Sequence, residues 1–212
     1  MDVDAVEIRV LGCLIEKQRT TPDAYPLSLN ALRLACNQAT NRDPVVAYEE
    51  REIKAALDRM SNRGWTRFAS GASSRALKYR QLLDEALGLS EPEISLLGVL
   101  MLRGPQTVGE LKQRSERLHR FGSITEVAEI LDGLTQRELV ARLERRPGQK
   151  EERWQQLLGG DAEATAEPVA PVVTPEADEG ADRIGAIEER LERLEGAFDE
   201  LIARLDKVPD RE

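Results

Sequence analysis

The chain has 212 residues, of which 41% are hydrophobic and only 4% aromatic. This length suits two small cores rather than one large domain, and a core of Leu, Ile, Val and Ala is typical of helical packing rather than of β-sandwiches. No apolar run approaches the roughly 18 residues of a membrane span, and the N-terminal segment lacks the basic start and apolar core of a signal peptide. We therefore expect a cytoplasmic protein with no membrane contact.

The formal net charge of -9 is distributed unevenly along the chain. Residues 1–160 hold 24 Lys and Arg against 23 Asp and Glu, whereas residues 161–212 hold 6 against 16. The acidity therefore belongs to the C-terminal tail, and it does not argue against a nucleic-acid surface in the rest of the chain.

Residues 1–83 show three helical segments followed by a hairpin. The first helix is expected over 6–17, and a second follows, capped by Ser28 or by the preceding turn. A third is expected over 46–63, with Ile53, Leu57 and Met60 on its apolar side and Gly64 after it. The stretch 65–80 then contains two strand-like runs around a Gly/Ser turn. Three helices followed by a two-stranded hairpin is the order of a winged helix.

An internal repeat supports this interpretation, because the apolar side of the third helix recurs at an offset of 74 as Val127, Leu131 and Leu134. Ser123 is expected to cap the repeated helix, with Glu126 placed as in a capping box. The predicted fold class is mainly α with small β-hairpins: two tandem winged-helix domains, at 1–83 and 84–158, plus a C-terminal coiled-coil helix.

The tail divides into two segments. Residues 159–182 are rich in Pro, Ala and Glu without a periodic apolar face, which predicts a disordered acidic linker. Over 183–208 the apolar residues follow a heptad rhythm and predict a parallel, self-associating coiled coil. Its core positions are Ile184, Ile187, Leu191, Leu194, Phe198, Leu201, Leu205 and Val208. An amphipathic helix folding back onto the body is the alternative, and Ile202 leaves both dimers and trimers open.

Several segments carry a family resemblance: TTPDAYPLSLNALRLACNQATNRDPV from residue 20, KYR at 78–80, GLSEPEISLLGVLMLRGPQTVGEL at 88–111, and RLHRFGS at 117–123. With these segments the chain resembles the YceH-like family of uncharacterised bacterial proteins over roughly residues 4–160. The resemblance implies a tandem winged-helix fold, and it brings no activity, ligand or catalytic residue. We expect the tail after residue 160 to be an addition outside the family pattern.

Markers of catalysis and of metal binding are scarce. The chain has one histidine, His119, and it contains none of the G-x-S-x-G, Walker, G-x-G-x-x-G or H-E-x-x-H motifs. Cys13 and Cys36 lie in apolar helical contexts and are expected to be plain buried thiols. One histidine and two distant cysteines cannot supply the usual four metal ligands. We therefore predict no enzyme, no metal and no cofactor.

The first domain offers a possible surface for double-stranded DNA. Residues 59–83 carry six Lys and Arg and no acidic residue, and phosphate neutralisation is the largest sequence-independent term in DNA binding. The candidate contacts lie before the third helix, on its outward face or on the hairpin: Arg42, Tyr48, Arg51, Lys54, Arg59, Arg67, Arg75 and Lys78. A solvated basic hairpin is the alternative, and Glu49, Glu50 and Glu52 weaken the DNA hypothesis.

The second domain is expected to present an acidic face instead. Glu126, Glu129 and Asp132 lie on or beside the outward side of its third helix, where they would repel phosphate and favour a protein partner. Two hypotheses thus remain. The chain is a DNA-binding, transcription-regulator-like protein, or its winged-helix domains are a scaffold for protein–protein interaction.

Overall fold

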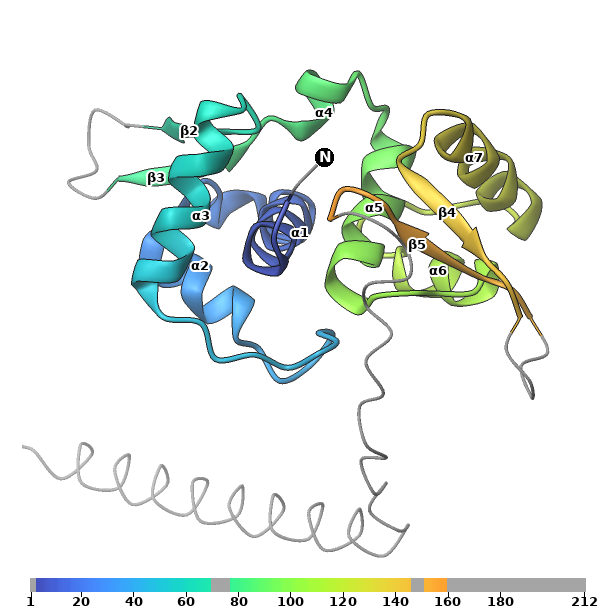
Figure 1. Ribbon diagram of the computed structural model, residues 1–212, viewed down its shortest axis with the longest axis horizontal. Helices are drawn as coiled ribbons and strands as arrows, with labels where there is room; N and C mark the ends of the chain where they lie inside the picture. Colours follow the sequence, from blue (N-terminus) through green and yellow to red (C-terminus); the bar gives the residue numbers. More distant parts are fainter. Residues whose placement is uncertain (1–2, 70–76, 146–150, 160–212) are drawn as a thin grey trace, which may run out of the picture. The chain divides into compact units, whose positions relative to one another are not determined.

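The computed structural model describes residues 3–69, 77–145 and 151–159. The chain divides into two compact units, residues 1–165 and 166–212, and all described residues belong to the first. Most of the predicted linker, from residue 160 on, and the whole predicted coiled coil lie outside the described residues. The first unit is mainly helical with two small antiparallel sheets (Figure 1), as the composition predicted.

The first half begins with three helices whose starts are capped by side chains. Helix α1 (Ala5–Thr20) starts at a capping box in which Asp4 accepts from the N–H of Glu7, and Glu7 accepts from the N–H of Asp4. A short 3-10 turn, η1 (Pro22–Ala24), and strand β1 (Leu27–Ser28) lead to α2 (Leu29–Cys36), which Ser28 caps as predicted. Helix α3 (Glu50–Asn62) follows.

A hairpin closes the first half. Strand β2 (Thr66–Ala69) pairs antiparallel with β3 (Lys78–Gln81), with Phe68 opposite Tyr79. Strand β1 adds to the other edge of β3, giving the order β1-β3-β2. The hairpin expected after Gly64 is therefore present, and it is anchored to the segment that precedes α2.

The second half repeats this order after a joint that contains α4 (Leu83–Leu87). It consists of α5 (Glu91–Arg103), α6 (Val108–Arg114), α7 (Ile124–Gln136) and the antiparallel pair β4 (Val140–Leu143) and β5 (Arg153–Gln156). Gln106, just before α6, forms a single antiparallel bridge with Trp154 of β5. This bridge occupies the place that β1 has in the first half.

The repeat extends to backbone hydrogen bonds at the predicted offset of 74. The N–H of Trp65 donates to the carbonyl of Met60 at 2.9 Å, and that of Leu139 to the carbonyl of Leu134 at 3.0 Å. The residue between helix and strand is left-handed in both copies, with φ of 75° at Gly64 and 56° at Glu138. The two halves thus use the same turn between their third helix and their hairpin.

Two details differ from the sequence-based expectations. Helix α3 begins at Glu50 rather than Val46, because the side chain of Asn37 holds the backbone of Tyr48 outside the helix, with bonds of 2.8 and 2.9 Å. At α7, Ser123 is the cap as expected, but the Glu126 carboxylate accepts from the N–H of Gly122 instead of completing a capping box.

The halves share one core instead of forming two small ones. Helices α1 and α5 pack against each other, and the buried apolar side chains form one continuous cluster across both halves. The approach is closest at two glycines: a Cβ at Gly12 would lie 2.9 Å from Leu102, and one at Gly98 would lie 2.9 Å from Ile15. Figure 1 shows α2 and α3 on the side of α1, and α6 and α7 on the side of α5.

Candidate nucleic-acid interface

Helix α3 buries one side and exposes the other, as its spacing predicted. Ile53, Leu57 and Met60 are buried, whereas Arg51, Lys54 and Arg59 are exposed.

The exposed cations of α3 already have carboxylate partners within the protein. Arg51 pairs with Glu49 at 2.8 Å, and Lys54 pairs with Asp58 at 2.9 Å. The Arg51 side chain is nevertheless 82% exposed, and a surface pair of this kind contributes at most about 1 kcal/mol. Arg51 can therefore turn to another partner at little cost, but the carboxylates would remain on the same face.

Arg59 has a structural role. It pairs with Asp4 and also with Glu7, whose carboxylate lies 3.3 Å from the Arg59 Nε. Arg63 binds the same Glu7 oxygen at 2.9 Å, and Glu7 is buried. These bonds tie the end of α3 to the start of α1. A phosphate would have to compete for Arg59 with two carboxylates.

Arg42, one of the predicted DNA contacts, lies in the protein interior, so this prediction is wrong. Its guanidinium donates to Glu16 at 2.6 and 3.1 Å, and it uses its remaining N–H groups on Gln38 and on the carbonyls of Ala35 and Asn41. Burial is the largest single effect and lowers the pKa of Arg42, but the hydrogen bonds and charge of Glu16 together with the neighbouring Cys13 raise it by more. All five N–H donors are satisfied, which leaves none for a phosphate.

Tyr48 is also displaced from its predicted position. It precedes α3 instead of lying on its outward face, and its half-buried ring packs against the core. Burial raises the pKa of its hydroxyl.

The first hairpin gathers three cations, of which Arg80 has a carboxylate partner and Arg67 and Lys78 do not among the described residues. Arg67 lies directly opposite Arg80 in the β2–β3 register, and Lys78 is two residues from Arg80 on the same side of β3. Like charges opposite each other destabilise a strand pair unless an anion lies between them. Arg80 pairs with Glu85 at 3.0 Å. Within the described residues, Arg67 and Lys78 have no hydrogen bond or ion pair from their side chains. Arg75 lies outside these residues.

The hairpin also exposes apolar surface, on the face opposite these cations, because successive side chains of a strand alternate between its two faces. Phe68 is 44% exposed, and its ring lies 5.2 Å from that of the buried Tyr79, measured between centroids. Leu77 is exposed as well. A firmly paired ribbon with cations on one face can lie along a polyanion with that face.

Helix α7 presents the acidic face that was expected of it. Glu129 and Asp132 are exposed, and the half-exposed Glu126 binds the backbone at the start of the helix. Beside this face, an open cavity of about 550 Å³ lies between α6, α7 and the second hairpin. Ile124, which is 55% exposed, and Ala128 contribute apolar surface to it, and Asp132 and Glu152 contribute carboxylates.

The other candidates for chemistry have structural surroundings. His119 stacks edge-on against Phe121, with ring centroids 4.8 Å apart, and its Nδ1 lies 3.3 Å from Glu91. Cys13 and Cys36 are buried free thiols, as expected, and they lie close to each other, which their spacing of 23 residues did not predict. The neighbouring Cys13 thiol, followed by burial, raises the pKa of the Cys36 thiol. Across residues 3–69, 77–145 and 151–159, no group of three or more His, Cys, Asp or Glu side chains could hold a metal ion.

Two further predictions concern the coiled coil and a membrane span. The coiled-coil positions from Ile184 to Leu205 all lie outside them. In the part of the chain that is described, no helix has the length and apolar character needed to cross a membrane.

Comparison with known proteins places the chain in a family. The family described as "Protein of unknown function, DUF480" matches residues 3–149. A UPF0502 protein of Solibacter usitatus is 46% identical over 198 residues, which cover 93% of this chain and 95% of the relative. A UPF0502 protein of Geobacter metallireducens is 47% identical over 197 residues, with 91% and 87% covered.

The relatives also correct the expectation about the tail. A UPF0502 protein of Pelobacter propionicus is 45% identical over 215 residues, which cover 99% of this chain and 96% of the relative. An alignment of this extent must include most of the residues after 160. The family model itself ends at residue 149, outside the tail, but this relative extends over the tail as well, so the tail is not an addition confined to this chain.

Proposed function

Since the chain belongs to this bacterial family of proteins of unknown function, we propose its role from the geometry: it is a non-catalytic tandem winged-helix protein that holds double-stranded DNA by its phosphates through the first hairpin. The observation that carries the proposal is the juxtaposition of Arg67, Arg80 and Lys78 on one side of the β2–β3 ribbon. Three helices followed by a hairpin, in each half, support the winged-helix assignment.

The proposed contact depends on the hairpin more than on α3. The cations of α3 are paired with carboxylates, whereas Arg67 has no such partner among the described residues and faces Arg80, whose own partner is Glu85. A phosphate between Arg67 and Arg80 would relieve their repulsion and form charge-assisted hydrogen bonds. Base contacts from α3 would have to displace Glu49 and Asp58. We therefore propose backbone binding with little sequence preference.

Fluorescence anisotropy with a labelled duplex of mixed sequence tests this proposal. We expect binding at about 50 mM salt that weakens steeply by about 200 mM, because each phosphate contact releases a condensed counterion. The double substitution Arg67→Glu and Lys78→Glu should weaken binding at least about tenfold and lower the salt slope by about two. The matched control is Arg120→Glu, in the second half, where the side chain is 84% exposed. Absence of binding at low salt, or equal losses in both variants, would contradict the proposal.

A second candidate function is protein binding by α7. The specific observation is the pairing of exposed apolar surface at Ile124 with the carboxylates of Glu129 and Asp132, which have no ion pair among the described residues, beside an open cavity. A partner with a basic and apolar surface would complement it. Affinity capture with wild type and with Glu129→Lys plus Asp132→Lys should lose that partner, whereas Glu116→Lys, outside α7, should retain it. Retention in all three proteins would exclude α7 as the contact.

For the tail, we propose parallel self-association through the heptad residues of 183–208. Eight apolar positions in unbroken heptad rhythm support it. Light scattering should give a larger number of subunits for the full chain than for a chain ending at residue 160. Equal numbers would rule out this role.

A further inference from the structure

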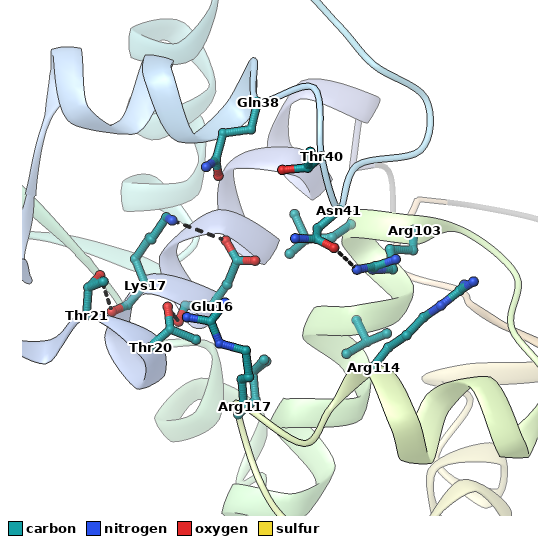
Figure 2. Close-up of a pocket in the computed structure, with 13 residues that line it drawn as sticks. Glu16, Lys17, Thr20, Thr21, Gln38, Thr40, Asn41, Arg103, Arg114 and Arg117 are labelled. Atoms are coloured by element: carbon teal, nitrogen blue, oxygen red, sulfur yellow. Dashed lines mark hydrogen bonds and ion pairs between the residues drawn. The ribbon is translucent and has the colours of Figure 1, made fainter. Parts of the chain in front are cut away.

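A cavity of about 260 Å³ lies where the two halves meet (Figure 2). Its walls come from the end of α1, the connection between α2 and α3, the end of α5, and the end of α6 with the residues after it. The connection is fixed to α5 by a 2.8 Å hydrogen bond from the N–H of Asp43 to the carbonyl of Leu102. The cavity is thus built from both halves, and it is separate from the first hairpin.

Cations from separate segments line this cavity: Lys17 from α1, Arg103 from α5, and Arg114 and Arg117 from α6 and the turn after it. The one carboxylate among the lining side chains, Glu16, binds the buried Arg42 at 2.6 Å and also pairs with the lining Lys17 at 3.8 Å, as Figure 2 shows. Arg114 shares Glu110 with Arg153. Among the described residues, the Arg117 side chain has no hydrogen bond or ion pair. The cavity therefore has a surplus of positive charge.

The direction of the pKa shift of Arg103 agrees with this surplus of positive charge. Burial, followed by the neighbouring guanidinium groups of Arg114 and Arg42, lowers the pKa of Arg103. Its hydrogen-bond partner is the Asn41 side-chain carbonyl, a neutral group, as Figure 2 shows. Neighbouring positive charges disfavour the charged form of an arginine, and a bound anion would reverse that effect.

Two neutral amide side chains that line the cavity also offer hydrogen-bond donors. The side-chain carbonyl of Asn41 accepts from Arg103, and that of Gln38 accepts from Arg42. Each amide therefore has its NH₂ group left to donate. The apolar side chains of Val99, Leu102 and Leu118 form the rest of the wall. An oxyanion attached to a small organic group fits this combination of donors and apolar surface.

We propose that this cavity binds a small phosphate ester, whose phosphate lies among Lys17, Arg103 and Arg117. The planar guanidinium forks match phosphate geometry, and the cavity is smaller than the roughly 300 Å³ at which sites for drug-sized ligands begin. The ligand is therefore an ester of a few carbon atoms. It would bridge the two halves and stabilise the shared core.

Isothermal titration of the full chain with inorganic phosphate and with glycerol 3-phosphate tests the proposal. We expect glycerol 3-phosphate to bind more tightly than inorganic phosphate, because the apolar wall takes up the carbon chain, and to raise the thermal midpoint with saturation. Malonate is the carboxylate comparison and glycerol the uncharged one. Malonate binding as tightly as glycerol 3-phosphate would overturn the assignment to phosphate.

The decisive variants are Arg117→Gln and Arg103→Gln. Each should weaken glycerol 3-phosphate about tenfold, the usual loss for one charge-assisted hydrogen bond. Arg120→Gln is the matched control, because this residue is also an arginine, is exposed like Arg117 and does not line the cavity. Equal affinities for Arg117→Gln and Arg120→Gln would overturn the site. Duplex binding should be unchanged in Arg117→Gln, and a parallel loss of DNA would instead assign these cations to the nucleic-acid surface.

Discussion

At the scale of single residues, the same ion pair recurs in both halves with different burial. Glu7 caps α1 and binds Arg63 at 2.9 Å, and Glu93 caps α5 and binds Arg137 at 3.1 Å. The Glu7 side chain is only 2% exposed, whereas that of Glu93 is 21% exposed. Glu7 also binds Arg59. Because solvent weakens ion pairs, the two glutamates should differ in their contribution to stability.

We therefore predict that Glu7→Gln lowers the free energy of unfolding by about 2–3 kcal/mol, since it removes the buried partner of two arginines. Glu93→Gln should cost about 1 kcal/mol, because its pair is partly solvated. The amide preserves an acceptor for the cap in both variants. Urea denaturation at neutral pH measures both values. Equal losses would mean that burial of the pair has no influence.

At the scale of elements, both halves turn from the third helix into the hairpin through one left-handed residue. The first half uses Gly64, at φ 75°, and the second uses Glu138, at φ 56°. A Cβ at Gly64 would meet no atom within 4 Å, so only backbone conformation restricts this position. In the left-handed region a side chain costs roughly 1–2 kcal/mol, and Asn tolerates it better than Ala.

The corresponding prediction compares two substitutions at Gly64. Gly64→Ala should lower the free energy of unfolding by about 1–2 kcal/mol, and Gly64→Asn by less than about 1 kcal/mol. Chemical denaturation of the two variants beside wild type gives the comparison. If Asn were as costly as Ala, a cause other than φ would have to explain the loss.

At the scale of the whole molecule, the contact between α1 and α5 joins the halves into one core. A Cβ at Gly12 would lie within 3.0 Å of Leu102 and of the Cβ of Met101, so the helices approach too closely for a side chain. Gly133 on α7 is also a helical glycine, but a Cβ there meets no atom within 4 Å. Substitutions at Gly12 and Gly133 therefore separate the effect of helix propensity on stability from the effect of packing between the halves.

We predict opposite effects for the same substitution at these positions. Gly12→Ala should destabilise the protein by roughly 1–3 kcal/mol, because overpacking outweighs the gain in helix propensity. Gly133→Ala should stabilise it by about 0.5–1 kcal/mol. Thermal and urea unfolding of both variants measure the effects. A stabilising Gly12→Ala would show that α1 and α5 can separate without cost.

Local chemistry in the sequence determined the elements of this protein. Apolar spacing, the Ser28 and Ser123 caps, and the offset of 74 between Ile53 and Val127 were enough to predict three helices and a hairpin in each half. These signals work because caps and helical periodicity depend on residues within a few positions of one another. The start of α3 was predicted four residues too early, because it depends on Asn37, which holds the backbone of Tyr48 outside the helix from eleven residues away.

Only the tertiary structure decided which of the arginine and lysine side chains are available to bind an anion. Arg42 and Arg67 look alike in the sequence, yet one satisfies Glu16 in the interior and the other faces Arg80 on the surface. The meeting of Lys17, Arg103 and Arg117 around one cavity likewise depends on the packing of α1 against α5. Ion pairs and cavities join residues distant in sequence, so their formation follows from the packing of the core and not from any local pattern.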